Sequence, residues 1–252
     1  MTFFSTSTES SSFVAAGTTS TLYAIDENTV IKLRPPPSSS SSDFERRAYD
    51  IEVRCYKRLG HHKQIVSCEV TEEGLLLGRG TCLRRTLQSV SDLDVKIRWA
   101  QEAANGLAYI HSKGIIHADI GCHNIIVDDT GHVKFIDFAG SGIDDEAPLV
   151  CYEWCSFQAG NEIGIGTDIF AFGSMLFELE TGRVAYSELQ DTLGMGRLMT
   201  VVGELFAKKK FPPVEMLVFG SVISGCWNGK YISMEEVRRD IAQCEDYSEE
   251  ML

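Results

Sequence analysis

The sequence predicts an α+β fold with two lobes, a small sheet-rich lobe followed by a larger helical one. Strand-like segments gather before about residue 80, whereas helical periodicity dominates after about residue 89. A chain of 252 residues, 44% of them hydrophobic, can build a sizeable core. Strands and helices that are segregated along a chain are typical of α+β proteins. We expect the lobes over residues 13–79 and 80–246, between a disordered Ser/Thr-rich tail over residues 1–12 and a C-terminal tail over residues 247–252.

The first lobe is expected to contain several short strands. Residues 13–33 carry strand-forming apolar residues on either side of the turn signal Asp26-Glu27-Asn28, which predicts two adjoining strands. Residues 65–70 and 74–77 predict two more.

A linker and a helix are expected within this lobe. Pro35 to Ser42 predicts a stiff and then flexible connection, which is either a plain linker or a site of phosphorylation. Asp43 is expected to cap the next helix. Apolar residues recur at helical spacing from Phe44 to Leu59, and Gly60 is expected to end this helix.

The second lobe is expected to be mainly helical. Apolar residues at i, i+3 and i+4 spacing predict a helix over about residues 97–110, before a break at Gly114. Residues 125–136 predict a β-hairpin. The segment from Asp168 to Leu179 is apolar on most sides, which predicts a buried helix.

The composition argues against several kinds of partner. The formal net charge of −13 disfavours nucleic acid and anionic membranes, because both are bound chiefly through Lys and Arg. No apolar run approaches the roughly 18 to 20 residues of a membrane span, and the N-terminus does not resemble a secretory signal. The eight cysteines form no C-x-x-C pair, so we expect no zinc site. We expect reduced thiols and an intracellular location, in the cytoplasm or the nucleus.

The strongest chemical signal lies in a polar segment of the second lobe. His117-Ala118-Asp119 is followed by Asn124 and then by Asp137, at H-x-D-x-x-x-x-N…D spacing. Asp119 can accept or orient the proton of an attacking hydroxyl. Asn124 and Asp137 offer the hard oxygen ligands that Mg²⁺ requires. Each residue alone has an ordinary structural explanation, so the interpretation depends on the whole set.

Two features of the first lobe fit a nucleotide site. Lys32 interrupts an apolar strand segment, and it either points to solvent or needs a carboxylate partner to offset its desolvation. Glu45 and Glu52 on the following helix are the candidates, and Glu52 is the better one. Ala15 and Gly17 lie in a turn where backbone amides can approach phosphates, although a plain hairpin turn explains this segment equally well.

Together these motifs resemble those of eukaryotic-type protein kinases, and the chain looks most like the compact kinase-domain proteins of filamentous fungi. The likeness covers about residues 13–241 and implies a two-lobed protein-kinase-like fold that binds ATP and Mg²⁺. It implies that Lys32 holds the α- and β-phosphates, with Glu52 as its partner. It also implies that Asp119 is the catalytic-loop aspartate and that Asn124 and Asp137 bind the metal.

The resemblance assigns three further segments. Leu77 to Gly80 falls where the hinge pairs its backbone with adenine, so Gly78 and Gly80 are candidate nucleotide-binding residues. Tyr152-Glu153 looks like the remnant of the Ala-Pro-Glu segment, and Asp168 is similar to the aspartate that braces the catalytic loop.

The chain also departs from the kinase pattern. Ala118 replaces the arginine that receives an activation-loop phosphate, so control through that contact is not expected. Gly121 replaces the lysine that contacts the γ-phosphate, and the nearby His123 is expected to be mostly neutral at pH 7. Glycines of the pattern are also replaced at Ala15, Ser20 and Ala139. Each of these replacements is expected to cost about one to a few kcal/mol of transition-state stabilisation, which lowers the rate about tenfold or more.

The sequence leaves three functions open. The leading hypothesis is ATP–Mg²⁺-dependent phosphoryl transfer to a Ser or Thr hydroxyl of a protein, without activation-loop phosphorylation control. The alternative is a pseudokinase that binds nucleotide and acts as a scaffold or allosteric partner. The degraded glycine loop and Gly121 favour this alternative, whereas the intact set of Lys32, Glu52, Asp119, Asn124 and Asp137 opposes it. A small-molecule phosphotransferase of the aminoglycoside-kinase type uses a similar motif, but the short interval before His117 leaves little room for its helical insertions.

Overall fold

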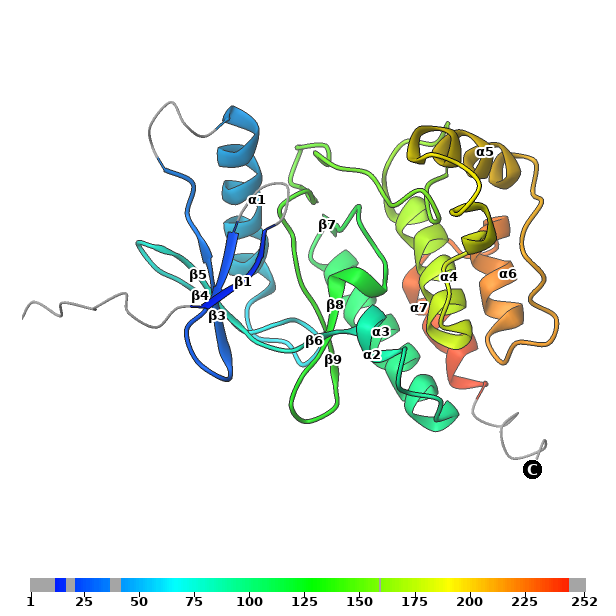
Figure 1. The fold of residues 1–252 in the computed structure, drawn as a ribbon, viewed down its shortest axis with the longest axis horizontal. Helices are drawn as coiled ribbons and strands as arrows, with labels where there is room; N and C mark the ends of the chain where they lie inside the picture. The colour runs from blue at the N-terminus through cyan, green and yellow to red at the C-terminus, as the bar shows by residue number, and fades with distance from the viewer. Residues whose placement is uncertain (1–11, 17–20, 37–41, 159, 245–252) are drawn as a thin grey trace, which may run out of the picture.

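The structure is a computed structural model that describes residues 12–16, 21–36, 42–158 and 160–244. These residues form a sheet-rich lobe with one long helix and a larger helical lobe beside it, which confirms the predicted α+β fold (Figure 1). The C-terminal tail lies outside the described residues, and so does the N-terminal tail except for Ser12.

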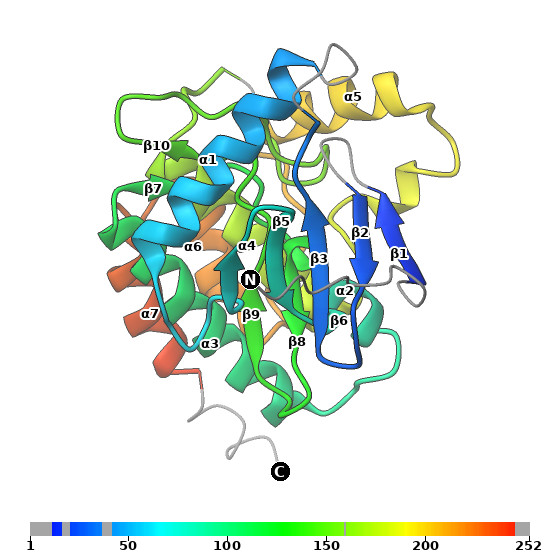
Figure 2. The same cartoon turned by 90° about the vertical axis from the view of Figure 1, so that its left-hand side faces the viewer.

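The first lobe is built on a five-stranded antiparallel sheet with the strand order β1-β2-β3-β5-β4. Its strands are β1 (Ser12–Ala16), β2 (Thr21–Ala24), β3 (Thr29–Leu33), β4 (Cys68–Val70) and β5 (Gly74–Gly78). Figure 2 shows β3 between β2 and β5. Because side chains alternate between the two faces of a strand, Val30 and Lys32 share the buried face of β3.

Helix α1 (Asp43–Leu59) buries an apolar stripe in the hydrophobic core. The stripe contains Ala48, Ile51, Cys55 and Leu59, all fully or almost fully buried. Ser42 caps the helix, because its hydroxyl accepts the amide of Glu45 at 3.1 Å while the Glu45 carboxylate accepts the amide of Ser42 at 2.7 Å. The expected cap at Asp43 was therefore wrong by one residue, and Gly60 ends the helix as predicted.

The second lobe combines short strands near the lobe boundary with a bundle of helices. The strands are β6 (Thr81–Cys82), β7 (Ile115–Ile116), β8 (Ile125–Val127), β9 (Val133–Phe135) and β10 (Gly142–Ile143). The helices are α2 (Leu83–Thr86), α3 (Leu93–Ser112), α4 (Ile165–Thr181), α5 (Met195–Ala207), α6 (Gly220–Asn228) and α7 (Met234–Ala242), with 3₁₀ turns η1 (Cys122–Asn124) and η2 (Ser187–Leu189). The predicted hairpin over residues 125–136 is present as the antiparallel pair β8–β9.

Helix α4 is the centre of this lobe. It is buried along most of its length, as its apolar composition predicts, and it packs against α6 and α3. Gly173 allows the close approach to α6, because a Cβ there would lie 2.6 Å from the Cβ of Cys226. In the part of the chain that the structure describes, no helix is both long enough and apolar enough to cross a membrane.

Candidate active site

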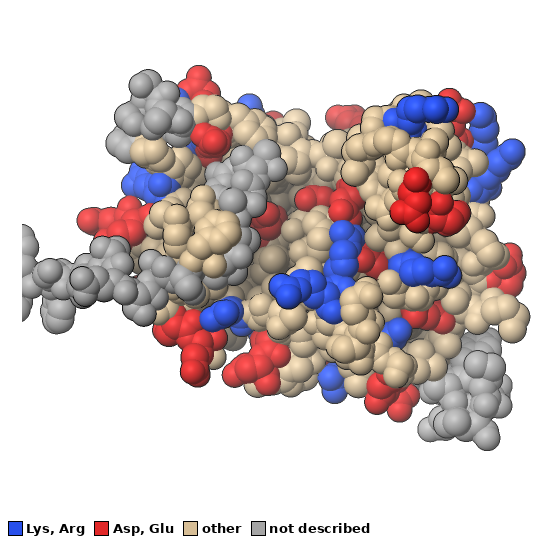
Figure 3. Space-filling model, in the orientation of Figure 1, with Lys and Arg blue, Asp and Glu red and all other residues tan. Residues whose placement is uncertain are grey.

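A cleft at the lobe boundary contains a cavity of about 450 Å³. Figure 3 shows basic and acidic side chains gathered where the two lobes meet. Apolar side chains line one part of the cavity, and these are Leu22, Val30, Leu77, Ile126 and Ile136. Lys32, Glu52 and Asp137 line another part. The cavity can therefore receive a ligand with a flat apolar portion and an anionic portion.

Lys32 lies on the buried face of β3 and is only 4% exposed. Its Nζ lies 2.7 Å from the carboxylate of Glu52 on α1 and 2.8 Å from that of Asp137, which follows β9. Burial lowers the pKa of Lys32, but the two carboxylates outweigh it and raise this pKa above its usual value. Lys32 is therefore a fixed cation inside the cleft. Glu45, the other candidate partner, instead caps the start of α1.

Asp168, at the N-terminal end of α4, fixes the loop that carries Asp119. It is fully buried and accepts the backbone amides of His117 and Ala118, each at 2.9 Å. It also accepts the Tyr152 hydroxyl at 2.8 Å. Ala118 has a φ of 67°, a conformation that is strained for a residue with a side chain. The Asp168 carboxylate therefore holds a strained peptide directly before Asp119.

Asn124 holds Asp119 from the other side. The Asn124 Nδ2 donates to the backbone oxygen of Asp119 at 2.9 Å and to its Oδ2 at 2.8 Å. This leaves the Asn124 Oδ1 without a hydrogen-bond partner in the described part of the chain. Asp137 has a half-exposed side chain, so its carboxylate has open coordination positions besides Lys32.

These two oxygen donors fit a Mg²⁺ ion. Mg²⁺ is usually bound by one or two protein oxygens together with substrate phosphates and water, rather than by a complete protein cage. Asn124 and Asp137 are therefore candidates for a partial magnesium site.

His123 lies between two carboxylates, which the sequence did not reveal. Its Nε2 lies 3.2 Å from Asp119 Oδ1, and its Nδ1 lies 3.1 Å from Glu153 Oε2. Burial lowers the pKa of His123, but Asp119 and Glu153 together raise it to about 10. The expectation of a mostly neutral His123 at pH 7 was therefore wrong, because it ignored carboxylates that the fold brings to the ring.

The glycine candidates differ in what the structure says of them. Gly78 and Gly80 line the cavity. Gly80 also requires glycine for packing, because a Cβ there would lie 2.7 Å from the backbone oxygen of Val127. At Gly78 a Cβ would lie 2.8 Å from Ser67 Oγ, a side-chain atom that can rotate away. Ala15 lies in β1, whereas Gly17 lies outside the described residues, so the phosphate-covering turn stays a prediction.

Helix α1 is joined to the segment after β10 by a cluster of ion pairs that sequence reasoning missed. We call this cluster the α1 clasp; it contains Arg47, Arg54, Arg58, Asp144 and Glu146. Arg54 lies 2.6 Å from Glu146, Arg58 lies 2.6 Å from Asp144, and Arg47 lies 3.2 Å from Glu146. The partners are about 90 residues apart in the chain, so no local pattern indicates the pairing. The clasp ties the helix that carries Glu52 to the second lobe.

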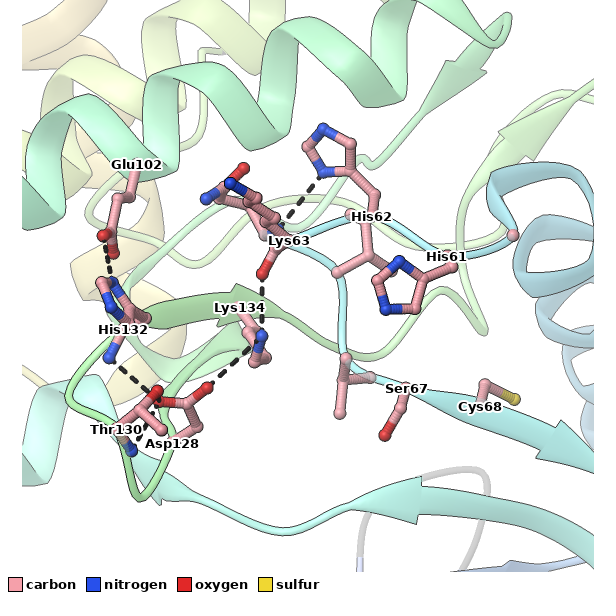
Figure 4. A pocket seen from close by; sticks show the side chains of 14 residues that line it. His61, His62, Lys63, Ser67, Cys68, Glu102, Asp128, Thr130, His132 and Lys134 are labelled. Atoms are coloured by element: carbon pink, nitrogen blue, oxygen red, sulfur yellow. Dashed lines mark hydrogen bonds and ion pairs between the residues drawn. The ribbon is translucent and has the colours of Figure 1, made fainter.

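A second cavity, of about 770 Å³, lies away from these residues, between the α1–β4 connection and the β8–β9 turn (Figure 4). Its charged groups largely pair with one another. His132 lies 2.5 Å from Glu102, and Lys134 lies 3.3 Å from Asp128 and donates to the backbone oxygen of Lys63. None of the described site candidates lines it. Lys32, Glu52, Gly78, Gly80 and Asp137 line the cleft cavity instead, whereas Asp119 and Asn124 line neither of these two cavities.

Comparisons with known proteins agree with this geometry. A family model described as "Protein kinase domain" matches residues 37–217, well over half of the chain. Serine/threonine-protein kinase 12 of Arabidopsis thaliana is 27% identical over 232 residues, which cover 81% of this chain and 49% of that protein. Mitogen-activated protein kinase kinase kinase 1 of the same plant is 30% identical over 109 residues, 40% of this chain and 18% of that protein. Serine/threonine-protein kinase kin-29 of Caenorhabditis briggsae is 30% identical over 144 residues, 52% of this chain and 16% of that protein.

The chain spans less than half the length of each of these relatives. The family match begins after β3, so the place of Lys32 rests on the geometry described above. The match does include the loop of Asp119 and Asn124, the residues around Asp137, and all of α4. By this match and by its two-lobed fold, the chain belongs to the protein kinase domain family.

Proposed function

We propose that this chain is a protein kinase that uses ATP and Mg²⁺ to phosphorylate Ser or Thr hydroxyls of a protein substrate. The observation that carries the proposal is the convergence of Lys32, Glu52 and Asp137 within 2.8 Å in one cleft. An isolated buried lysine is costly, and here its charge is offset by two carboxylates in a cavity that can receive a nucleotide.

Each residue has a defined task in this proposal. Lys32 binds the α- and β-phosphates, and Glu52 holds Lys32 in place. Asn124 and Asp137 would hold Mg²⁺, which neutralises charge on the phosphates during transfer. Asp119 orients the attacking hydroxyl and accepts its proton as the bond to phosphorus forms. The apolar wall of the cavity, near the backbone of Gly78 and Gly80, receives the adenine.

The proposed kinase works without phosphorylation of its activation segment. The α1 clasp supports this, because Asp144 and Glu146 already supply the negative charges that face the arginines of α1. Ala118 is buried and has no charge with which to bind a phosphate. In this proposal the Lys32–Glu52 contact requires no phosphorylated side chain.

The names of the relatives support a protein as substrate, and a Ser or Thr hydroxyl as acceptor. A likeness to fungal kinase-domain proteins and an intracellular location remain part of the proposal. All eight cysteines are unpaired, which supports a reducing compartment.

Radiolabelled ATP with a panel of general Ser/Thr protein substrates tests the proposal. We expect transfer that requires Mg²⁺ and that Asp119→Asn and Asp137→Asn abolish. Absence of transfer in the wild type, together with retained nucleotide binding, would instead identify the pseudokinase alternative.

A further inference from the structure

Gly121 leaves a space in the catalytic loop that the ring of His123 fills. A Cβ added to Gly121 would lie 2.5 Å from Nδ1 and 2.6 Å from Cε1 of His123. The φ of Gly121 is 178°, an extended conformation that any residue adopts. Glycine is therefore required here by the position of the ring and not by the backbone.

The ring in this space contacts Asp119. His123 Nε2 lies 3.2 Å from Asp119 Oδ1, whereas Asn124 Nδ2 binds Asp119 Oδ2 at 2.8 Å. Each oxygen of the Asp119 carboxylate thus has its own side-chain partner. A carboxylate held at both oxygens cannot rotate freely, which fixes the oxygen that receives a proton.

The other edge of the ring meets a set of ion pairs from three further segments. Glu153 Oε2 lies 3.1 Å from His123 Nδ1. Arg84 of α2 binds both oxygens of Glu153, at 2.9 and 2.6 Å, in a bidentate arrangement. The same guanidinium binds Glu178, a residue of α4 that is only 4% exposed. The ring is therefore connected, through Glu153 and Arg84, to the buried central helix of the lobe.

We propose that His123 is the positioning residue for Asp119, and that Gly121 is glycine in order to admit its ring. The inference rests on the proposed function, in which Asp119 receives the hydroxyl proton. Glu153 lies behind the ring at ion-pair distance, and Arg84, itself bound to Glu178, fixes Glu153 in place.

Paired substitutions test the steric fit between the two residues. Gly121→Ala removes no functional group but displaces the ring of His123, so we expect kcat to fall about 10- to 100-fold. We expect the same fall in kcat for His123→Ala, which removes the ring. The double variant is no slower than His123→Ala, because the ring that the methyl group displaces is already gone. His123→Gln keeps a donor for Asp119 and recovers part of the loss. Gly196→Ala is the matched control, because nothing lies within 4 Å of its added Cβ, and it keeps wild-type kcat.

Two further readouts separate positioning from general damage. The KM for ATP stays within about threefold of wild type in all variants, since Lys32 is untouched. In the nucleotide-free protein, ¹⁵N NMR signals of the His123 ring shift in Gly121→Ala and in Asp119→Asn, while those of His62 do not. His62, in the connection between α1 and β4, stacks on Tyr109 of α3 and serves as the internal control.

Wild-type kcat in Gly121→Ala and His123→Ala would overturn the inference. If the wild type transfers no phosphoryl group, the proposed function fails, and the NMR measurement alone decides the positioning contact. Unchanged His123 signals in Gly121→Ala and Asp119→Asn would then refute it.

Discussion

Asp168→Asn is expected to destabilise the protein and to impair catalysis through the loop before Asp119. The Asp168 carboxylate accepts the amides of His117 and Ala118 on different oxygens, each at 2.9 Å. An asparagine has one acceptor oxygen and turns its NH₂ group toward the other amide. One buried N–H then lacks a partner, which costs about 1–3 kcal/mol, and the remaining bonds lose their charge assistance. We therefore expect the free energy of unfolding to fall by about 2–4 kcal/mol.

The same substitution relaxes the strained peptide at Ala118, which has a φ of 67°. Asp119 follows directly, so a shift of about 1 Å in this loop lowers kcat about 100-fold. Urea unfolding and steady-state phosphoryl transfer measure the two effects. Tyr152→Phe is the matched control, because it removes the hydroxyl that donates to Asp168 at 2.8 Å. It leaves the hydrogen bonds from the backbone amides of His117 and Ala118 to Asp168 intact. The control is expected to lose only about 0.5–1.5 kcal/mol. An Asp168→Asn variant with wild-type stability and wild-type kcat would refute the reasoning.

Three further predictions concern other parts of the site. Neutralising the α1 clasp with Asp144→Asn and Glu146→Gln is expected to lower kcat and to remove part of the salt dependence of kcat. The control Glu235→Gln breaks the exposed ion pair with Arg238 on α7 and leaves phosphoryl transfer unchanged. Equal salt profiles of kcat in the wild type and the clasp variant would contradict this prediction. Cys82 lines the cleft cavity, whereas Cys151 is exposed outside it. If ATP binds in this cavity as proposed, it slows alkylation of Cys82 but not of Cys151, as measured by mass spectrometry; equal protection of both thiols, or of neither, argues against the proposed nucleotide site. Burial raises the pKa of Glu153, but Arg84 and His123 outweigh it and hold this pKa well below its usual range. As the pH falls below about 4.3 the unfolded chain takes up a proton, whereas the folded chain keeps Glu153 ionised to a much lower pH. Stability therefore falls progressively as the pH drops below about 5, and Glu153→Gln flattens this part of the urea-unfolding profile.

Local patterns were sufficient for the fold class and for part of the site, although residues 13–33 form parts of three strands where two were expected. Lys32 could be assigned to a strand because its neighbours are apolar, and the stripe of α1 followed from helical spacing. The hairpin β8–β9 followed from a turn signal between two apolar segments. These features depend on neighbours a few residues away, which the sequence displays directly.

The remaining features depend on residues that are distant in the chain. Arg84, Glu153 and Glu178 form one set of ion pairs, although 69 and 94 residues separate Arg84 from its partners. The charge of His123 depends on that set, since Glu153 faces one edge of the ring. No spacing rule predicts such contacts, because they arise only when the catalytic loop, α2 and α4 pack together.

The α1 clasp and Ala118 are best understood together. A phosphate on the activation segment can order a kinase only if cations are available to bind it. In this chain Arg47, Arg54 and Arg58 already face Asp144 and Glu146, and the catalytic-loop position is a buried alanine. A phosphate added to this segment would therefore compete with two carboxylates for the same arginines and gain little. We expect treatment with a broad-specificity phosphatase to leave the transfer rate unchanged, whereas a several-fold loss of rate would show that a modified side chain, and not the clasp, holds α1 in place.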